Sequence, residues 1–319
     1  MSASQLSVRV VRKHVEAEGI CSFELADPHG AALPAFSAGA HIDVHIPGGF
    51  TRQYSLCNHP AERHRYVIAV LHDAQSRGGS RAMHERVEEG STLEISAPRN
   101  HFPLDPGAPR HLLLAGGIGI TPMLCMAETL ASEGEPFAMH YCARSRGCAA
   151  FVEHLGCAPY ADRVQCHFDD EDPGQRLDIA ALLAAADTDA HMYVCGPKGF
   201  MDAVLKTARR LGWAEERLHH EFFAASVDTT GGAFEVKLAS SGRTVVVPAE
   251  QTVAEALANA GVDVPISCGQ GICGTCLVRV LEGEPDHRDL YLSPEEQARN
   301  DQFTPCCSRA RSRTLVLDL

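Results

Sequence analysis

Cys268-Gly-Gln-Gly-Ile-Cys273-Gly-Thr-Cys276 determines the architecture of the C-terminal part of this 319-residue chain. The three cysteines have the spacing C-x4-C-x2-C, and Cys306 follows after 29 further residues. Four cysteines in this pattern are typical ligands of a plant-type [2Fe-2S] cluster. The glycines between them permit a tight loop whose backbone N–H groups turn toward the cluster sulfurs. The pattern predicts a one-electron carrier with Cys268, Cys273, Cys276 and Cys306 as its iron ligands.

Two other uses of cysteine fit the sequence less well. Zinc sites combine C-x2-C motifs with each other or with a histidine pair, and the C-x4-C spacing matches neither. A disulfide framework requires an oxidising compartment, whereas the N-terminal residues MSASQLSVRVVRKH contain no apolar signal-peptide core. Cys307 adjoins Cys306, and only one of the two is expected to bind iron. The spacing favours Cys306, which leaves Cys307 as a packed or partly exposed thiol.

The composition indicates a globular protein of two or three domains, with 45% hydrophobic and 22% charged residues. No apolar run approaches 18 residues, so we expect no transmembrane helix and no direct membrane partner. The net charge of −13 argues against a nucleic-acid partner, because phosphate contacts need clustered Lys and Arg. Thirteen cysteines without a signal peptide predict a cytoplasmic protein whose thiols stay reduced.

The hydrophobic pattern divides the chain into three blocks and a linker. Short alternating strands in residues 1–105 predict an antiparallel β-barrel. Strands that alternate with helices in residues 106–226 predict an α/β doubly wound parallel sheet. Residues 227–233 read as a linker, and the hairpin, helix and cysteine loop of residues 234–319 predict a β-grasp ferredoxin. Predicted strands cover 42–46, 51–56, 66–71, 93–96, 111–115, 137–142, 164–168, 191–195, 218–223, 234–238 and 244–247, and predicted helices cover 121–130, 150–155, 178–186, 199–211 and 252–260.

Arg52, Tyr54 and Ser55 share one predicted strand, with Arg52 and Tyr54 on the same face and Ser55 on the other. Arginine binds phosphate through two N–H groups, and tyrosine can contact a flat ring while its hydroxyl forms a hydrogen bond. Arg77-Gly-Gly79-Ser80 is predicted to begin a helix. Its free N–H groups and the Ser80 hydroxyl would form a phosphate cradle. Taken alone, the strand motif is equally compatible with a surface arginine.

Gly116-Gly-Ile-Gly-Ile-Thr121-Pro122 joins a predicted strand to a predicted helix. Its glycines would allow the backbone to approach a pyrophosphate, and Pro122 fits the first turn of a helix. The loop differs from the G-x-G-x-x-G dinucleotide motif. Cys195-Gly-Pro ends another predicted strand, at the carboxyl edge where parallel sheets bind ligands. A cysteine in that position is by itself more often a core residue.

The chain resembles the phthalate dioxygenase reductase family, which includes vanillate demethylase and phenoxybenzoate dioxygenase reductases. The resemblance rests on RQYSL, RGGS, AGGIGITP, YCARS, YVCGP, HHEFF and the cysteine loop, in the family's order over essentially the whole chain. It implies an FMN-binding barrel, an NAD domain and a ferredoxin. Carried over by position, the resemblance assigns FMN binding to Arg52, Tyr54, Ser55, Gly79 and Ser80. It assigns nucleotide binding to Gly116, Gly117 and Thr121. The residues that it places beside the reacting rings are Cys195, Ser55 and Phe223. Phe223 would stack on the flavin; a core aromatic is the alternative.

The resemblance implies an NADH-dependent reductase component of a two-component aromatic-ring oxygenase or O-demethylase. NADH delivers two electrons as hydride, the cluster accepts one, and a flavin between them can hold two, one or none. The family favours NADH over NADPH, and Asp169-Asp-Glu-Asp would repel a 2′-phosphate, although Arg144 and Arg146 lie near. The electron acceptor is predicted to be a separate protein, because no Rieske motif or 2-His-1-carboxylate site is evident in the sequence. The resemblance implies that this protein is a Rieske-type oxygenase.

Three other functions fit parts of the sequence: a self-sufficient NADH diaphorase, a non-enzymatic [2Fe-2S] redox sensor, and an electron carrier with vestigial upstream domains. The region before Cys306 is strongly acidic and is predicted to dock on a basic patch of the oxygenase. An ordinary solvated surface would have the same composition. The acidic residues are Glu282, Glu284, Asp286, Asp289, Glu295, Glu296 and Asp301.

Overall fold

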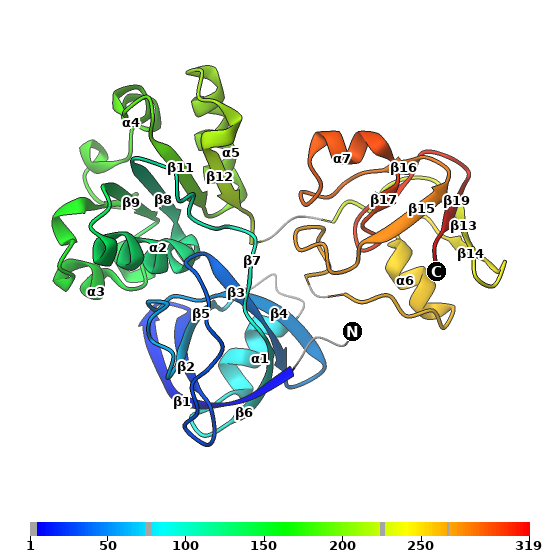
Figure 1. The fold of residues 1–319 in the computed structure, drawn as a ribbon, viewed down its shortest axis with the longest axis horizontal. Helices are drawn as coiled ribbons and strands as arrows, with labels where there is room; N and C mark the ends of the chain where they lie inside the picture. Colours follow the sequence, from blue (N-terminus) through cyan, green and yellow to red (C-terminus); the bar gives the residue numbers. More distant parts are fainter. Residues whose placement is uncertain (1–4, 74–77, 224–226, 267) are drawn as a thin grey trace. The chain divides into compact units, whose positions relative to one another are not determined.

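The computed structural model describes residues 5–73, 78–223, 227–266 and 268–319. Its internal contacts divide the chain into two compact units, Met1–Phe223 and Ala224–Leu319 (Figure 1). The first unit contains an antiparallel sheet followed by a parallel one, and the second contains a smaller mixed sheet. The sequence-derived domain boundaries within and between these units stay predictions. No helix among the described residues has the length and apolar character needed to cross a bilayer.

The antiparallel sheet pairs in the order β4-β3-β6-β1-β2-β5, with β7 beside β3. Its two end strands are β4 and β5, and the residues that follow β4 bond to β5. The Cys57 N–H donates to the Val67 carbonyl at 2.8 Å, and Asn58 Oδ1 accepts from the Val67 N–H at 2.8 Å. These bonds close the sheet into the predicted barrel. The elements are β1 (Gln5–Ala17), β2 (Ile20–Ala26), β3 (Ala40–Ile46), β4 (Phe50–Ser55), β5 (Tyr66–Leu71), α1 (Gly79–Arg86), β6 (Thr92–Ser96) and β7 (Arg99–Asn100).

The barrel core follows from the alternation of the strands. Inward side chains are fully buried, among them Val8, Phe23, Ile42 and Ile68, and Met83 of α1 packs against them. The β3–β4 hairpin turns at two glycines with φ of 101° and 81°, a left-handed conformation that favours glycine. This hairpin joins the strands predicted over residues 42–46 and 51–56.

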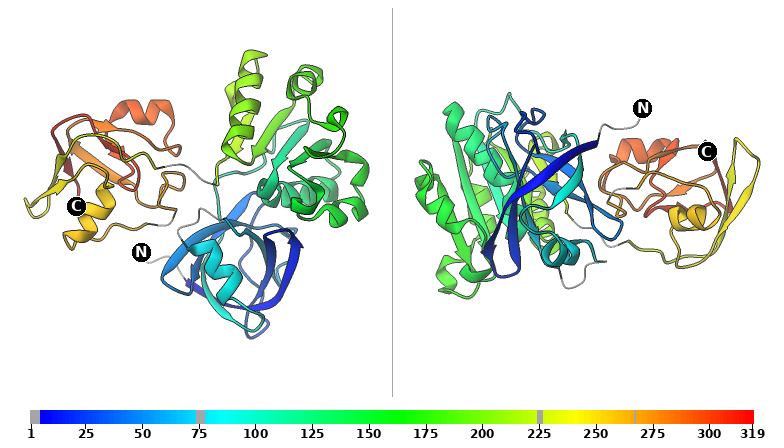
Figure 2. Two further views of the ribbon diagram at one scale, coloured as in Figure 1. Left: turned by 180° about the vertical axis from the view of Figure 1, so that it is seen from behind. Right: turned by 90° about the horizontal axis from the view of Figure 1, so that it is seen from below.

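The second sheet of the first unit is parallel and has the order β10-β9-β8-β11-β12. Residues of α2 and α3 belong to the core on one face, and residues of α4 and α5 to the core on the other (Figure 2). The elements are β8 (His111–Gly116), η1 (Gly117–Gly119), α2 (Ile120–Glu133), β9 (Phe137–Ala143), η2 (Arg146–Cys148), α3 (Val152–Cys157), η3 (Ala161–Arg163), β10 (Val164–Phe168), η4 (Pro173–Gln175), α4 (Ile179–Ala185), β11 (His191–Cys195), α5 (Lys198–Arg210), η5 (Glu215–Arg217) and β12 (Leu218–Glu221).

This order confirms the predicted doubly wound sheet and reverses between β8 and β11, which makes their carboxyl ends the topological switch point. Predicted element ends agree with the observed ones to within two residues, except that α2 continues three residues beyond its predicted end, to Glu133. The third helix begins at Val152 rather than Ala150, because Phe151 adopts a left-handed conformation with φ of 62°.

The second unit confirms the predicted β-grasp ferredoxin fold. Its main sheet has the order β14-β13-β19-β15-β17, in which β13 and β19 run parallel. The helix predicted to begin after Thr252 does so, with a capping box between Thr252 and Glu255. The elements are β13 (Phe234–Leu238), β14 (Thr244–Val247), α6 (Val253–Asn259), β15 (Val278–Glu282), β16 (Pro285–Asp286), α7 (Pro294–Arg299), β17 (Gln302–Phe303), β18 (Arg309–Ala310) and β19 (Thr314–Leu317).

Candidate functional site

Tyr54 presents a buried hydroxyl that has no hydrogen-bond partner among the residues described. It lies on β4, two positions from Arg52, so both side chains point to the same side as predicted. Burial raises the pKa of Tyr54 well above its ordinary value, so the hydroxyl stays protonated and can donate. A buried hydroxyl without a partner is costly. A bound ligand with an acceptor group would remove that cost.

The amino end of α1 lies directly against Arg52. A Cβ on Gly79 would come within 2.9 Å of Arg52 Cγ and Nε, so glycine is required for this close packing. Gly78 precedes the helix in a left-handed conformation with φ of 103°, and no described side chain caps the helix. The N–H groups at the start of a helix, beside a guanidinium group, form a site suited to phosphate. Ser80 Oγ accepts a hydrogen bond from the Asp73 N–H at 3.3 Å, and the predicted contribution of Arg77 lies outside the described residues.

The glycine loop after β8 packs against the turn after β11. A Cβ on Gly116 would lie 2.9 Å from Pro197 Cδ, and one on Gly119 would lie 2.7 Å from the Gly196 backbone N. These two glycines therefore permit the close packing of the two loops, and the predicted approach of this loop to a pyrophosphate stays a prediction. Gly117 differs, because it has φ of 52° and nothing lies within 4 Å of its Cβ position. The open space for a ligand is above Gly117.

Thr121 and Cys195 flank this loop and are both buried. The Thr121 hydroxyl donates to the Ile118 carbonyl at 3.0 Å, so it fixes the loop to the first turn of α2. Cys195 ends β11 with no exposed surface. Burial, together with the nearby Glu221 carboxyl, raises the pKa of the Cys195 thiol well above its ordinary value. The thiol is therefore neutral and acts by shape and contact rather than as a nucleophile.

Glu221 is the residue that the sequence did not single out. It ends β12, and its Oε2 accepts a long hydrogen bond of 3.5 Å from Ser55 Oγ on the barrel strand β4. Burial raises the pKa of Glu221 to about 8. The HHEFF motif contained this carboxylate, and its position at the carboxyl end of a parallel strand was the available signal. Phe223 follows two residues later and packs, partly buried, against the core that contains α2.

The candidate cofactor-selecting residues lie at the carboxyl ends of β9 and β10. Arg146 pairs with Glu171 at 3.4 Å and lies 4.6 Å from the centroid of the Phe168 ring. Arg144 is exposed. One of the two nearby arginines is thus already paired with a carboxylate, which weakens the argument for a bound 2′-phosphate.

The predicted iron ligands gather in the second unit. Cys268, Cys273, Cys276 and Cys306 are all buried. Hydrogen bonds from Cys273 and Cys306 lower the pKa of Cys268, so the Cys268 thiol contacts those of Cys273 and Cys306, and Cys306 also contacts Cys276. The Gln270 N–H donates to Cys268 Sγ at 3.3 Å, as expected for a loop that wraps a cluster. The donor set and the loop fit an iron–sulfur cluster.

Cys307 has different surroundings. It is 2% exposed, its Sγ lies 3.3 Å from Thr304 Oγ1, and a Cβ on Gly271 would collide with it. It is a packed thiol whose side chain also contacts that of Cys306, so the choice of Cys306 over Cys307 as the fourth iron ligand stays a prediction. Asp289 lies beside Cys307 at 6% exposure and accepts hydrogen bonds from the Leu292 N–H and the Ser308 hydroxyl.

The predicted acidic docking face needs correction. Asp289 is buried, Asp286 pairs with Arg288 at 2.6 Å, and Glu284 pairs with Arg311 at 3.3 Å. Glu296 is engaged in the capping box of α7. Exposed acidic side chains in this region are reduced to Glu282, Glu295 and Asp301, together with the ion-paired Glu284.

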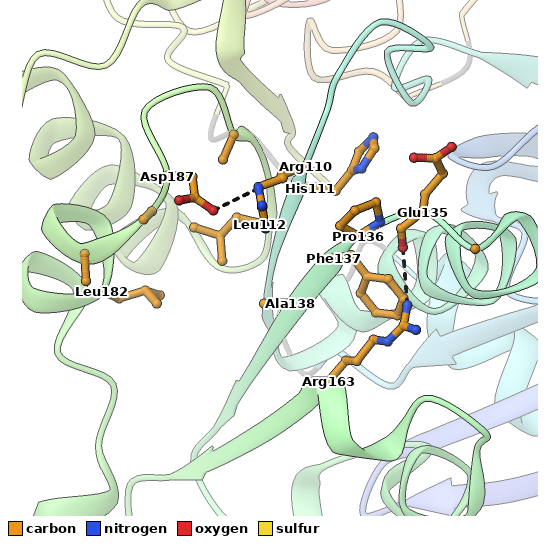
Figure 3. A pocket seen from close by; sticks show the side chains of 14 residues that line it. Arg110, His111, Leu112, Glu135, Pro136, Phe137, Ala138, Arg163, Leu182 and Asp187 are labelled. Atoms are coloured by element: carbon orange, nitrogen blue, oxygen red, sulfur yellow. Dashed lines mark hydrogen bonds and ion pairs between the residues drawn. The ribbon is translucent and has the colours of Figure 1, made fainter.

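A pocket of about 530 Å³ opens at the amino edge of the parallel sheet, the edge opposite the glycine loop (Figure 3). Arg110 and Arg163 stand on its rim. Arg110 pairs with Asp187 at 3.0 Å, and Arg163 donates to the Glu135 carbonyl at 3.3 Å. The strands of the sheet start here rather than end, so this pocket is not the expected nucleotide site.

Two protein-family models match the chain. The 2Fe-2S iron-sulfur cluster binding domain matches residues 236–311, and the oxidoreductase NAD-binding domain matches residues 113–206. The vanillate O-demethylase oxidoreductase of Pseudomonas putida is 58% identical over 97% of this chain and 98% of its own, and that of Pseudomonas sp. (strain HR199 / DSM 7063) is 54% identical over 98% and 100%. A solved phthalate dioxygenase reductase, described as a modular structure for electron transfer from pyridine nucleotides to [2Fe-2S], is 41% identical with a TM-score of 0.79, over 99% of this chain and 98% of that one.

Proposed function

The chain belongs to the phthalate dioxygenase reductase family, and we propose that it is the NADH-dependent reductase component of a two-component oxygenase. Electrons enter from NADH in the first unit, pass through FMN, and leave through the [2Fe-2S] cluster of the second. This proposal rests on the match of the whole chain to a reductase that transfers electrons from pyridine nucleotides to a [2Fe-2S] cluster. Four buried, grouped cysteines in the cluster-binding domain support it.

The barrel residues fit FMN. Arg52 and the uncapped amino end of α1, with Gly79 and Ser80, would hold its phosphate, and the Tyr54 hydroxyl would donate to an acceptor group of the cofactor. When bound, FMN takes up two electrons from NADH as a hydride and releases them singly. The protein's part is to orient the two rings and to exclude water from between them.

The residues at the topological switch point fit NADH. The open space above Gly117 would receive the pyrophosphate, Gly116 and Thr121 shape the loop around it, and the neutral Cys195 would lie beneath the nicotinamide. Phe223 would cover the flavin until the nicotinamide enters. NADH is favoured over NADPH because Arg146 is already paired with Glu171.

Ser55 and Glu221 join the barrel to the sheet at the place where the two rings would meet. At neutral pH the Glu221 carboxyl holds its proton, because burial raises its pKa to about 8. A protonated carboxyl in hydrogen-bonding reach of Ser55 Oγ can supply and recover a proton through that hydroxyl as the charge of the site changes. Ser55 and Glu221 are thus the proton-handling pair of the site.

Cys268, Cys273, Cys276 and Cys306 would hold the cluster, and Cys307 supports the loop from below. The acceptor is a separate Rieske-type oxygenase, and the 54–58% identity to vanillate O-demethylase oxidoreductases favours an O-demethylating partner. Relatives named for dioxygenases and for a monooxygenase show that the same architecture serves other oxygenase systems. We place the reaction in the cytoplasm, where thiols stay reduced and available to a cluster.

Reconstitution tests this function. The purified protein is combined with the oxygenase component of a vanillate O-demethylase, NADH and vanillate, and formaldehyde release is measured against NADH consumption. The proposal predicts product only when both proteins are present. If NADH oxidation with small acceptors is rapid but no oxygenase component that partners this family yields product, the diaphorase is favoured. Absence of NADH oxidation in the protein with both cofactors bound would favour a redox sensor.

A further inference from the structure

Two histidines and an aspartate meet toward the amino edge of the parallel sheet, and none of the three is among the residues assigned above. His191 begins β11, His219 lies near the start of the neighbouring β12, and Asp105 belongs to the connection between β7 and β8. Cys195 ends the same strand that His191 begins. Four residues at about 3.3 Å each separate the two ends of β11 by about 13 Å. This cluster is therefore distinct from the nicotinamide site.

The three ligand atoms are close enough to share one ion. His191 Nδ1 lies 2.9 Å from His219 Nε2 and 3.7 Å from Asp105 Oδ2, and all three lie within 4.8 Å of one another. A point equidistant from atoms so spaced is about 2.4 Å or less from each, close to the zinc–nitrogen and zinc–oxygen distances of 2.0–2.2 Å. No other group of three His, Cys, Asp or Glu side chains within the described ranges meets this criterion.

The three side chains are held in place before any ion arrives. The ring of His219 stacks on His191 and on Tyr193, with centroid separations of 5.2 Å and 4.5 Å. The Tyr193 hydroxyl accepts from the Asp105 N–H, and Asp105 Oδ1 accepts from the Gly107 N–H, both at 2.8 Å. These contacts leave Asp105 Oδ2 directed at the histidines. Such supporting contacts commonly orient metal ligands in proteins.

We propose that Asp105, His191 and His219 form a binding site for a divalent first-row transition ion, with Zn²⁺ as the probe of choice. Two imidazoles and one carboxylate suit this class of ion, and water would complete a tetrahedron, since the Asp105 side chain is 39% exposed. The sequence did not reveal this group, because residues 105, 191 and 219 come together only in the fold. A bound ion would fix the β7–β8 connection to β11 and β12.

The chain contains a matched control. His140 and His167 form a second stacked pair, with centroids 5.3 Å apart and Nδ1 of the first 3.0 Å from Nε2 of the second. This pair lacks the carboxylate, and His167 Nδ1 already contacts the Gln175 carbonyl at 2.6 Å. His140→Gln therefore removes one member of an equivalent imidazole pair without touching the proposed site.

The test uses the protein with flavin and cluster in place, stripped of adventitious metal and titrated with Zn²⁺. Zinc K-edge absorption spectroscopy separates a nitrogen–oxygen shell near 2.0–2.1 Å from a sulfur shell near 2.3 Å, so binding to the free thiols is recognised. We expect one equivalent in a nitrogen–oxygen shell for the wild type and for His140→Gln. We expect His219→Gln to weaken it at least about 100-fold, and Tyr193→Phe, which acts through Asp105, by about 10-fold.

Flavin and cluster absorbance identify any variant that has not folded. If His219→Gln does not fold, anomalous diffraction at the zinc edge on wild-type crystals decides, with a peak among Asp105, His191 and His219 expected. A sulfur shell, equal binding by wild type and a folded His219→Gln, or absence of binding at millimolar Zn²⁺ would each overturn the proposal. None of these readouts depends on reductase activity, so their failure leaves the proposed function untouched.

Discussion

Gly119→Ala tests whether the close packing of the glycine loop controls the rate of hydride transfer at the nucleotide site. A methyl group at this position would lie 2.7 Å from the Gly196 backbone N and closer still to the Cys195 carbonyl. Carbon contacts are normally about 3.5–4.0 Å, so the turn after β11 must move by about 1 Å. The obstacle is backbone on both sides, and no flexible side chain can yield in its place.

That displacement acts on the residues proposed to lie beneath the nicotinamide. Misplacement of a reacting group by about 1 Å can lower a rate by about 100-fold, and overpacking of this kind costs about 1–3 kcal/mol of stability. We therefore expect anaerobic stopped-flow measurements to show flavin reduction by NADH slowed by about 100-fold. Flavin and cluster content should stay unchanged, because the barrel and the ferredoxin do not contain the substituted loop.

Gly156→Ala is the matched control. Gly156 lies in α3 with nothing within 4 Å of its Cβ position, so alanine is accommodated and should raise helix stability by up to about 1 kcal/mol. Its flavin-reduction rate should equal that of the wild type. A Gly119→Ala protein that reduces its flavin at the wild-type rate would refute the assignment of this loop to the nucleotide site.

Three further predictions concern the cofactor sites. Cys306→Ser should abolish the [2Fe-2S] electron paramagnetic resonance signal of the reduced protein, whereas Cys307→Ser should retain it; the reverse pattern would exchange the two assignments. Tyr54→Phe should weaken FMN binding by about 10-fold in fluorescence titrations, whereas unchanged binding with higher stability would mean that the buried hydroxyl has no ligand partner. Burial raises the pKa of Glu221 from 4.5 in the unfolded chain to about 8 in the folded protein. Between these two pH values the folded protein keeps a proton that the unfolded chain loses. The contribution of Glu221 to stability therefore falls as the pH rises from 4.5 to about 8. The thermal midpoint of flavin release should fall more steeply from pH 5.5 to 8.5 in wild type than in Glu221→Gln. The stability lost across this window is at most about 3 kcal/mol, and partial exposure reduces it; equal slopes would contradict the raised pKa.

Local sequence signals predicted the elements of the fold because each has a local physical cause. Thr252 and Glu255 have the spacing of a capping box, which is a local signal for the start of a helix and does not depend on the rest of the fold. The spacing of the cysteines is likewise a local signal, because it is set by the geometry of the cluster that they bind. The same reasoning could not assign Gly119, whose lack of a side chain is required by Cys195 from a different strand.

The features that the sequence did not reveal all join residues distant in the chain. Ser55 and Glu221 are separated by 166 positions, so no local pattern pairs them, although Ser55 was a candidate site residue on its own. Asp289 was grouped with exposed acidic residues because composition does not distinguish a carboxylate that accepts buried hydrogen bonds from one in solvent. Such pairings are set by strand order and packing, which local patterns do not specify.

An anaerobic NADH titration of the purified protein tests the proposed electron path most directly. Flavin absorbance reports reduction in the first unit, and low-temperature electron paramagnetic resonance reports the reduced cluster in the second. The account predicts that NADH bleaches the flavin and that the signal of a reduced [2Fe-2S] cluster grows with it. A bleached flavin beside an intact cluster that stays oxidised would contradict the account, since electrons would then stop at the flavin.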